Sequence, residues 1–273
     1  MAVKRTDYTE EAVAAAYSVI IELSHLLAAY HDDIVLVGGW VPQFLLPNAA
    51  RKHVGSLDVD LALNHQTLQE TAYETIRDLL LSHGYAQGKQ PFIFYKTVTR
   101  KSMAFDVEVD FLAGEYDGSS KKHRTQKVQD ILPRKARGCD LVFTMATEES
   151  ITGNLPEGGI DTVSVHVASI VPFIVMKAMA LADRLKEKDA WDLYYCVRYY
   201  PEGIDSLVKV FQPAMEFGLV REAMIKLAEK FASPNHIGPK FVADFDEIID
   251  PEEREIIQQD AYQRINTFLS MLK

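Results

Sequence analysis

The sequence lacks most of the features that mark disulfide-rich, fibrous or membrane-spanning proteins. Its 273 residues contain two cysteines, Cys139 and Cys196, which argues against a disulfide scaffold and favours a reducing compartment such as the cytoplasm. Neither cysteine stands in a motif that would activate a thiol nucleophile. No apolar run reaches the roughly 18 residues of a membrane span, and there is no internal repeat.

Metal-binding histidine motifs are also absent. The eight histidines show no spacing typical of a metal site. Five of them are interpreted as surface or loop residues: His25, His31, His65, His83 and His236.

The charge balance is acidic, with 39 Asp and Glu against 29 Lys and Arg and a net charge of −10. This balance disfavours a broad surface that coats nucleic acid. The stretch 121–137 is the exception, because it holds seven basic residues against one acid, Asp130. Two interpretations of it stay open: a guide for an RNA or nucleotide phosphate, and a solvated loop.

Hydrophobic periodicity and turn residues predict an α+β fold with two domains, 1–166 and 167–273. The first domain is expected to be a mixed sheet with flanking helices, and the second to be helical. The predicted strands are 34–37, 57–63, 92–98, 104–112, 141–144 and 162–167. The predicted helices are 8–30, 40–46, 67–82, 172–199, 204–211, 214–231 and 251–272.

An acidic pair lies in the strand predicted at 57–63. Asp58 and Asp60 point to the same face, because strand side chains alternate. They are separated by roughly 6.6 Å of strand rise, and two such carboxylates can hold a pair of Mg²⁺ ions about 3.5–4 Å apart. Mg²⁺ takes its other ligands from water and substrate phosphates, so the pair indicates chemistry on a nucleoside triphosphate. The alternative is a solvated face of an edge strand.

A second acidic strand follows at 104–112, where Asp106, Glu108 and Asp110 share one face. If it pairs with the strand at 57–63, one of the three lies about 5 Å away across the ladder. We assign the third metal ligand to Asp110, which would also assist deprotonation of an acceptor. Asp106 and Glu108 remain alternatives for this role. The non-catalytic alternative is an exposed strand face whose acidic residues pair with Lys or Arg.

Upstream of the acidic pair, a strand ends in Gly38-Gly39. Two glycines let backbone N–H groups approach a phosphate, although such pairs are often simple tight turns. Ser56 offers a hydroxyl to a phosphate oxygen or caps the strand.

In the C-terminal half, positions 177, 181, 184 and 188 recur every three or four residues and so share one helix face. Lys177, Arg184 and Lys188 would form a basic stripe able to neutralise a triphosphate, with Asp189 and Asp192 orienting the cations. A solvated helix with ordinary i,i+4 pairs is the alternative. Trp191, not counted in the stripe, is assigned to the core.

The order strand, Gly-Gly, Ser-x-Asp-x-Asp, acidic strand resembles the nucleotidyltransferase fold shared by DNA polymerase β and its relatives. The C-terminal pattern of Lys177, Ala180-Leu181, Arg184, Lys188-Asp189 and Asp192-Leu193-Tyr194 narrows the resemblance to AbiEii-type nucleotidyltransferases, the toxin components of type IV-like toxin–antitoxin and phage-defence pairs. The match covers about 33–63, 104–112 and 170–196. Val54 and Lys188 stand where that family often has arginine.

The resemblance implies a Mg²⁺-dependent enzyme that moves a nucleoside monophosphate from an NTP to a tRNA end or a protein, with an antitoxin as partner. Catalysis and metal binding would fall to Asp58, Asp60 and Asp110, with Lys177 as a charge clamp. Nucleotide contacts would come from Gly38, Gly39, Ser56, Arg184, Lys188 and Asp189. Two alternatives stay open: a nucleotidyltransferase that modifies a small molecule such as an antibiotic, and a nucleotide-binding module that has lost catalysis.

Overall fold

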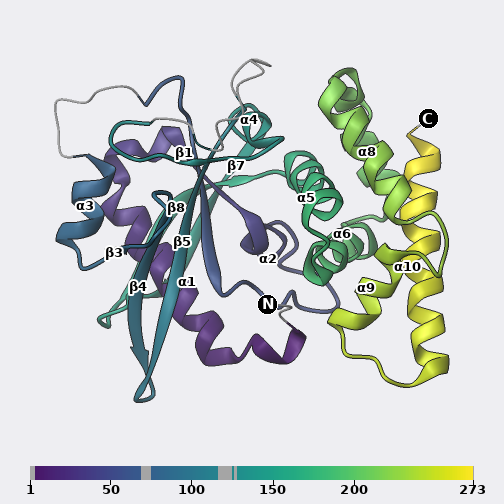
Figure 1. Cartoon of the computed structure of the whole chain (residues 1–273), viewed down its shortest axis with the longest axis horizontal. Coiled ribbons are helices and arrows are strands. Elements are labelled where there is room, and N and C mark those ends of the chain that lie inside the picture. The colour runs from purple at the N-terminus through teal and green to yellow at the C-terminus, as the bar shows by residue number, and fades with distance from the viewer. Residues whose placement is uncertain (1–3, 69–74, 116–124, 126–127, 273) are drawn as a thin grey trace. The chain divides into compact units, whose positions relative to one another are not determined.

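The computed structural model describes residues 4–68, 75–115, 125 and 128–272, and the chain divides into two compact units. The sheet unit comprises Tyr8–Phe44 and Gly55–Ser169. The helical unit comprises Met1–Asp7, Leu45–Val54 and Ile170–Lys273. Together they give the α+β class with a mixed sheet, flanking helices and a helical C-terminal region that the sequence predicted (Figure 1).

The sheet unit contains eight strands and the helices that flank them in the part of the chain that the structure describes. Its strands are β1 (Ile34–Val37), β2 (Asp58–Leu63), β3 (Ala86–Gln87), β4 (Ile93–Arg100), β5 (Met103–Ala113), β6 (Arg134–Lys135), β7 (Ala146–Asn154) and β8 (Ile160–Ala168). Its helices are α1 (Glu10–Leu26), α2 (Val41–Leu45), α3 (Ile76–Ser82) and α4 (Cys139–Val142), with 3₁₀ turns η2 (Ala28–Asp33) and η3 (Gly38–Trp40).

The eight strands form one mixed sheet in the order β3-β4-β5-β2-β1-β8-β7, with β6 added on β5. β2 pairs parallel with β5 and antiparallel with β1. β1 meets β8 in parallel at Leu36↔Val167, whereas β7 and β8 form a long antiparallel hairpin. The central position of β2 places the acidic pair in the middle of the sheet.

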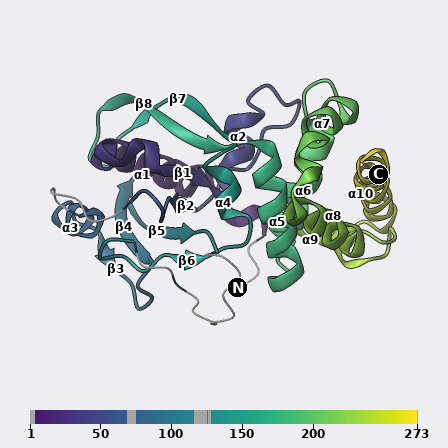
Figure 2. The same cartoon turned by 90° about the horizontal axis from the view of Figure 1, so that it is seen from above.

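α1 packs against β2, β4, β5, β7 and β8 and covers one face of the sheet (Figure 2). The helix begins at an N-cap, Thr9, whose hydroxyl accepts the backbone N–H of Ala12. Val59, Val109 and Phe111, which are fully buried, belong to the same sheet face by strand alternation. The core of this unit therefore lies on the side opposite the acidic residues of β2 and β5.

Two predictions for the sheet unit are wrong. Residues 141–144 were expected to form a strand, but Cys139–Val142 is the helical turn α4, which follows Gly138 in the left-handed conformation (φ 87°). Short apolar runs do not distinguish a strand from a buried helical turn. The strand β7 was not predicted, because its polar sequence becomes a strand only through pairing with β8.

The predicted helix 67–82 is shorter in the described residues. α3 begins at Ile76, and Thr75 caps it by accepting the backbone N–H of Asp78. Residues 69–74 of that prediction lie outside the described residues.

The helical unit contains α5 (Ile170–Arg184), α6 (Glu187–Tyr199), α7 (Ile204–Phe211), α8 (Gly218–Lys230), α9 (Ile237–Phe245) and α10 (Pro251–Met271), with 3₁₀ turns η1 (Arg5–Asp7) and η4 (Pro213–Glu216). α10 packs against α6, α7, α8 and α9, and α5 packs against α6 and α8. None of the helices in the described part of the chain combines the length and apolar composition that crossing a bilayer requires.

The single helix predicted at 172–199 is wrong, since α5 ends at Arg184 and α6 begins at Glu187. Leu185 between them has φ 50°, a left-handed conformation that ends a helix. The short helix α9 was not predicted. The break matters because the basic stripe was placed on one continuous helix face.

Candidate functional site

Four carboxylates lie on one face of the paired strands β2 and β5. The parallel register places Asp58 beside Glu108 and Asp60 beside Asp110. Partners in a ladder project to the same side, and neighbouring strands are about 4.8 Å apart. The two strands do pair, which is the condition on which the sequence argument for a third carboxylate depended.

The backbone and side chain of Asp58 are both held by neighbours within the sheet unit. The Ser56 hydroxyl donates a hydrogen bond to Oδ1 of Asp58. The indole N–H of Trp40, which is fully buried, donates to the backbone carbonyl of Asp58 at 2.7 Å. The Ser56 side chain therefore contacts the carboxylate of Asp58 directly.

Gly38 lies directly against the carboxylate of Asp60. A Cβ atom built on Gly38 would collide with Oδ2, Cγ and Cβ of Asp60. Gly38 also has φ 73°, which glycine adopts at little cost. Together with Gly39, which is buried in the same 3₁₀ turn, Gly38 gives the acidic face a backbone rim without side chains. The phosphate contact assigned to these glycines stays a prediction.

Asp110 is the most buried of the four carboxylates and pairs with Arg134, whose Nη2 donates to Oδ2 at 2.8 Å. Its other oxygen, Oδ1, is buried and has no hydrogen-bond partner. Burial raises the pKa of Asp110 to about 6 against the opposing effect of Arg134. The charges of Glu108 and Asp58 raise this pKa further.

Arg134 was not predicted as part of this site, although it belongs to the basic stretch 121–137. It lies in β6, which pairs with β5 at Leu112↔Arg134. Four other basic residues of the stretch, Lys121, Lys122, Arg124 and Lys127, lie outside the described residues. The excess of basic residues in 121–137 was the one sequence feature that pointed to a role for Arg134. The sequence did not show that β6 would pair with β5, because that pairing depends on tertiary structure.

The two alternatives to Asp110 have different surroundings. Glu108 accepts a hydrogen bond from the Tyr95 hydroxyl at 2.9 Å, across the β4–β5 pair. Asp106 is exposed, accepts from the Thr97 hydroxyl at 2.7 Å and lies before the segment of β5 that pairs with β2. Register therefore favours Glu108 and Asp110, and disfavours Asp106, as neighbours of the acidic pair.

The carboxylates of this face are chemically suitable ligands for Mg²⁺, but their oxygen atoms lie too far apart to bind one ion together. Carboxylate oxygens are the ligands that Mg²⁺ prefers, and the unpartnered Oδ1 of Asp110 is an acceptor that a cation would satisfy. However, Asp58, Asp60 and Asp110 do not form a group whose ligand atoms all lie within 4.8 Å of one another. Coordination of a single Mg²⁺ ion by all three therefore requires their side chains to move.

The helical unit places its predicted site residues in a separate, buried ion-pair network. Lys177 Nζ lies 2.9 Å from Asp189 Oδ1 and 2.8 Å from Asp192 Oδ2. Burial disfavours the charge on Lys177, but the two carboxylates outweigh it and raise the pKa of this lysine above its ordinary value. Lys177 is thus fully charged and already paired.

The same two carboxylates bind the other predicted cations. Arg184 donates from Nε to Asp189 Oδ2 at 2.7 Å and from Nη2 to Oδ1 at 2.9 Å. Lys188 Nζ lies 2.9 Å from Asp192 Oδ1. The network therefore spans α5 and α6, although the two helices do not share the continuous stripe that was predicted.

His53 completes this network and was not predicted to belong to it. Its Nε2–H donates to Asp192 Oδ1 at 2.9 Å, and its ring packs 5.1 Å from the Trp191 ring. Burial lowers the pKa of His53 to about 4 despite the hydrogen bond to Asp192, so the imidazole is neutral at pH 7. The contact could not be predicted from the sequence, because His53 precedes Asp192 by 139 residues.

The pKa values of both carboxylates follow from the same packing. Burial acts to raise the pKa of Asp189 and Asp192, but Lys177 and the neighbouring cations hold both below the ordinary value. Removal of one partner from such a buried ion-pair network lowers the stability of the fold, because it leaves the remaining charges unsatisfied.

Comparisons with protein-family models, curated proteins and solved structures found no match to this chain. The resemblance to nucleotidyltransferases therefore depends on the motif residues themselves.

Proposed function

We propose that this protein is a Mg²⁺-dependent nucleotidyltransferase that uses the acidic face of β2 and β5. The observation that carries the proposal is the pairing of Asp58 and Asp60 with Glu108 and Asp110 on one sheet face. Four carboxylates with partial compensation by Arg134 form a site that attracts a divalent cation and its bound phosphates.

Asp110 is suited to accept a proton in this reaction. The acceptor oxygen bonds to the α-phosphorus while the bond from that phosphorus to the bridging oxygen breaks and pyrophosphate leaves. The hydroxyl proton passes to a carboxylate, and Asp110 is the carboxylate of this face that has a buried oxygen without a hydrogen-bond partner. Mg²⁺, held by Asp58, Asp60 and Asp110, would neutralise charge on the triphosphate.

Glycine and serine would position the nucleotide. Gly38 and Gly39 present backbone beside Asp60, and the Ser56 hydroxyl already lies against Asp58. A direct triphosphate contact stays a prediction for four residues of the helical unit, Lys177, Arg184, Lys188 and Asp189. Their ion pairs support a structural role instead.

The acceptor follows from the resemblance alone. It implies a tRNA end or a protein in a cytoplasmic toxin or defence setting, with an antitoxin as partner. An antibiotic or another small hydroxyl compound would use the same four carboxylates.

The direct test is incubation of the full chain with each NTP labelled at the α-phosphate, Mg²⁺, and total RNA, lysate protein or an aminoglycoside panel. Transfer of label to one acceptor class identifies it, and Asp58→Asn should lower the rate by about a hundredfold or more. Asp106→Asn is the matched control, because it removes an exposed carboxylate of β5 outside the segment paired with β2. Absence of transfer with every NTP and acceptor would reject the proposal.

The second candidate is a nucleotide-binding module without turnover. The ion pair between Asp110 and Arg134 favours it, because the arginine already compensates one of the three assigned metal ligands. Calorimetry that shows Mg²⁺-dependent NTP binding together with zero transfer would support this candidate over the enzyme.

A further inference from the structure

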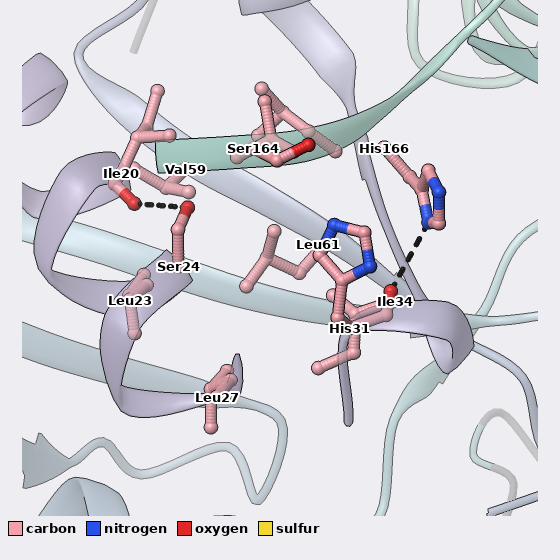
Figure 3. A pocket seen from close by; sticks show the side chains of 12 residues that line it. Ile20, Leu23, Ser24, Leu27, His31, Ile34, Val59, Leu61, Ser164 and His166 are labelled. Atoms are coloured by element: carbon pink, nitrogen blue, oxygen red, sulfur yellow. Dashed lines mark hydrogen bonds between the residues drawn. The ribbon is translucent and has the colours of Figure 1, made fainter. Parts of the chain in front are cut away.

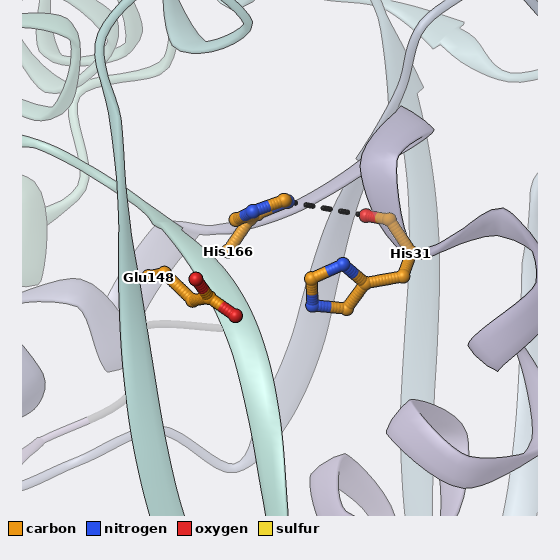
Figure 4. A group of neighbouring side chains, drawn as sticks. All are labelled: His31, Glu148 and His166. Atoms are coloured by element: carbon orange, nitrogen blue, oxygen red, sulfur yellow. Dashed lines mark hydrogen bonds between the residues drawn. The ribbon is translucent and has the colours of Figure 1, made fainter.

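A histidine–glutamate–histidine cluster lies in the sheet unit, apart from the four carboxylates of β2 and β5. His31 in η2, Glu148 in β7 and His166 in β8 each offer a ligand atom, and these atoms all lie within 4.8 Å of one another (Figure 4). Within the described residues this is the group of His, Cys, Asp and Glu side chains that meets this spacing. Glu148 and His166 are brought together by the β7–β8 register.

Both imidazoles have the hydrogen bonds that orient a metal ligand. His166 Nδ1 lies 3.2 Å from the backbone carbonyl of His31, which can only accept, so Nδ1 carries the proton and Nε2 keeps its lone pair. His31 Nδ1 lies 3.2 Å from the Asp32 carboxylate, which assigns the same tautomer. A carbonyl or a carboxylate bonded to the other ring nitrogen is the usual support of a metal-binding histidine.

His31 Nε2 supplies the second observation, because it is buried and has no hydrogen-bond partner. A buried lone pair without a donor costs free energy that a metal ion would recover. Glu148 is exposed and accepts a hydrogen bond from the Ser164 hydroxyl at 2.5 Å, which fixes its carboxylate beside the two rings. The rings themselves lie 4.2 Å apart between centroids.

A cavity of about 40 Å³ adjoins the cluster and is lined by His31, Ser164 and His166 together with apolar residues of α1 and β2 (Figure 3). It has room for at least one ordered water, which needs about 10–15 Å³. A metal ion held by three protein ligands could therefore keep a water as its fourth ligand.

We propose that His31, Glu148 and His166 form a binding site for a divalent transition-metal ion, with Zn²⁺ as its best representative. Two imidazoles and one carboxylate suit Zn²⁺, whereas Mg²⁺ prefers oxygen ligands alone. The ion would join η2 to the β7–β8 hairpin, next to the seam where β1 and β8 pair at Leu36↔Val167. The site is independent of the proposed nucleotidyltransfer.

The test is calorimetry of the untagged, EDTA-treated full chain with ZnCl₂ alone. The wild type should bind one equivalent, and Glu148→Gln, His31→Ala and His166→Ala should each bind at least tenfold more weakly. His25→Ala is the matched control, because His25 pairs with the carboxylate of Asp161 and has no place in the cluster. Co²⁺ binding, read from its visible absorption, should show the same ranking of variants.

Two further readouts keep the test decisive. Zn²⁺ should raise the thermal midpoint of the wild type more than that of Glu148→Gln at the same Zn²⁺ concentration. Glu148 is exposed, so Glu148→Gln is expected to fold even if a histidine variant does not. Asp58→Asn should retain full Zn²⁺ binding, so loss of nucleotidyltransfer and loss of zinc are separable. Equal Zn²⁺ affinity of the wild type and Glu148→Gln, or no binding by the wild type, overturns the proposal.

Discussion

The sheet unit and the helical unit both gather carboxylates, but they compensate them differently. On β2 and β5, four carboxylates share one face, and Arg134 pairs with one of them. In the helical unit, Asp189 and Asp192 are shared by three cations, Lys177, Arg184 and Lys188. Burial acts on both sets, yet it raises the pKa of Asp110 and is overcome at Asp189 and Asp192.

On β2 and β5 one arginine faces four carboxylates, whereas in the helical unit three cations face two carboxylates. Matched charges hold helices together, and their removal damages the fold. Carboxylates that repel one another lower stability, and the proposed function assigns the four of β2 and β5 to metal binding. This difference predicts opposite responses to substitution, pH and metal in the two units.

The greatest loss of stability is expected in the buried ion-pair network of the helical unit. Lys177→Ala leaves two buried carboxylates short of a cation, so we expect the free energy of unfolding to fall by about 3–5 kcal/mol. Urea unfolding followed by circular dichroism measures it. Lys226→Ala is the control in the same unit, because Lys226 makes a surface i,i+4 pair with Glu222 at 3.9 Å and should cost less than about 0.5 kcal/mol. A loss below 1 kcal/mol at Lys177 would mean that its charge is not structural.

The second effect concerns pH and His53. The folded-state pKa of about 4 lies below the ordinary 6.5, so the unfolded chain binds a proton first as the pH falls. The contribution of His53 is therefore fully present above about pH 6.5 and is lost by about pH 4, a change of about 3 kcal/mol. His53→Gln keeps a donor for Asp192 without titrating, so its stability should fall less over this interval.

Fluorescence of Trp191, whose ring lies beside His53, reports this unfolding in a Trp40→Phe background. His236→Gln provides the same chemical change at an exposed histidine of the helical unit. Parallel pH curves for wild type and His53→Gln would contradict the assignment of His53 to the network.

The third effect has the opposite sign and lies in the sheet unit. The folded-state pKa of Asp110, about 6, is above the ordinary 3.8, so the folded chain holds the proton longer as the pH rises. Stability should therefore fall between about pH 4 and pH 6 and stay lower above it, by about 2–3 kcal/mol. Asp110→Asn removes this titration, and its stability relative to wild type should rise across the same interval. Trp40 emission in a Trp191→Phe background follows the sheet unit, and Asp106→Asn should match the wild type.

The smallest effect is stabilisation by Mg²⁺. At ten times its dissociation constant, Mg²⁺ should stabilise the wild type by about 1.4 kcal/mol, and EDTA should reverse the shift in thermal midpoint. Asp60→Asn and Asp110→Asn should lose this response, while Glu148→Gln should retain it. A response that survives in Asp60→Asn would place the Mg²⁺ elsewhere than on β2 and β5.

Part of this architecture followed from local pattern. Ile34–Val37 and the strands around Asp58 and Asp110 were predicted, because strand alternation and glycine turns are local properties. The break at Leu185 was missed, since neither glycine nor proline marks it and a left-handed leucine depends on its surroundings. The polar strand β7 was missed for a similar reason, as pairing with β8 makes it a strand.

The acids of β2 share one face, and so do those of β5, because side chains along a strand alternate with a period of two, which the sequence alone contains. Which acids are neighbours depends on strand register: β2 and β5 pair Asp60 with Asp110, and β6 brings Arg134 to the same carboxylate. The tertiary structure also joined His31 to His166 across 135 residues of chain. Side-chain direction is fixed by local backbone geometry, whereas partners come from burial and strand pairing between distant segments, which no short window of sequence contains.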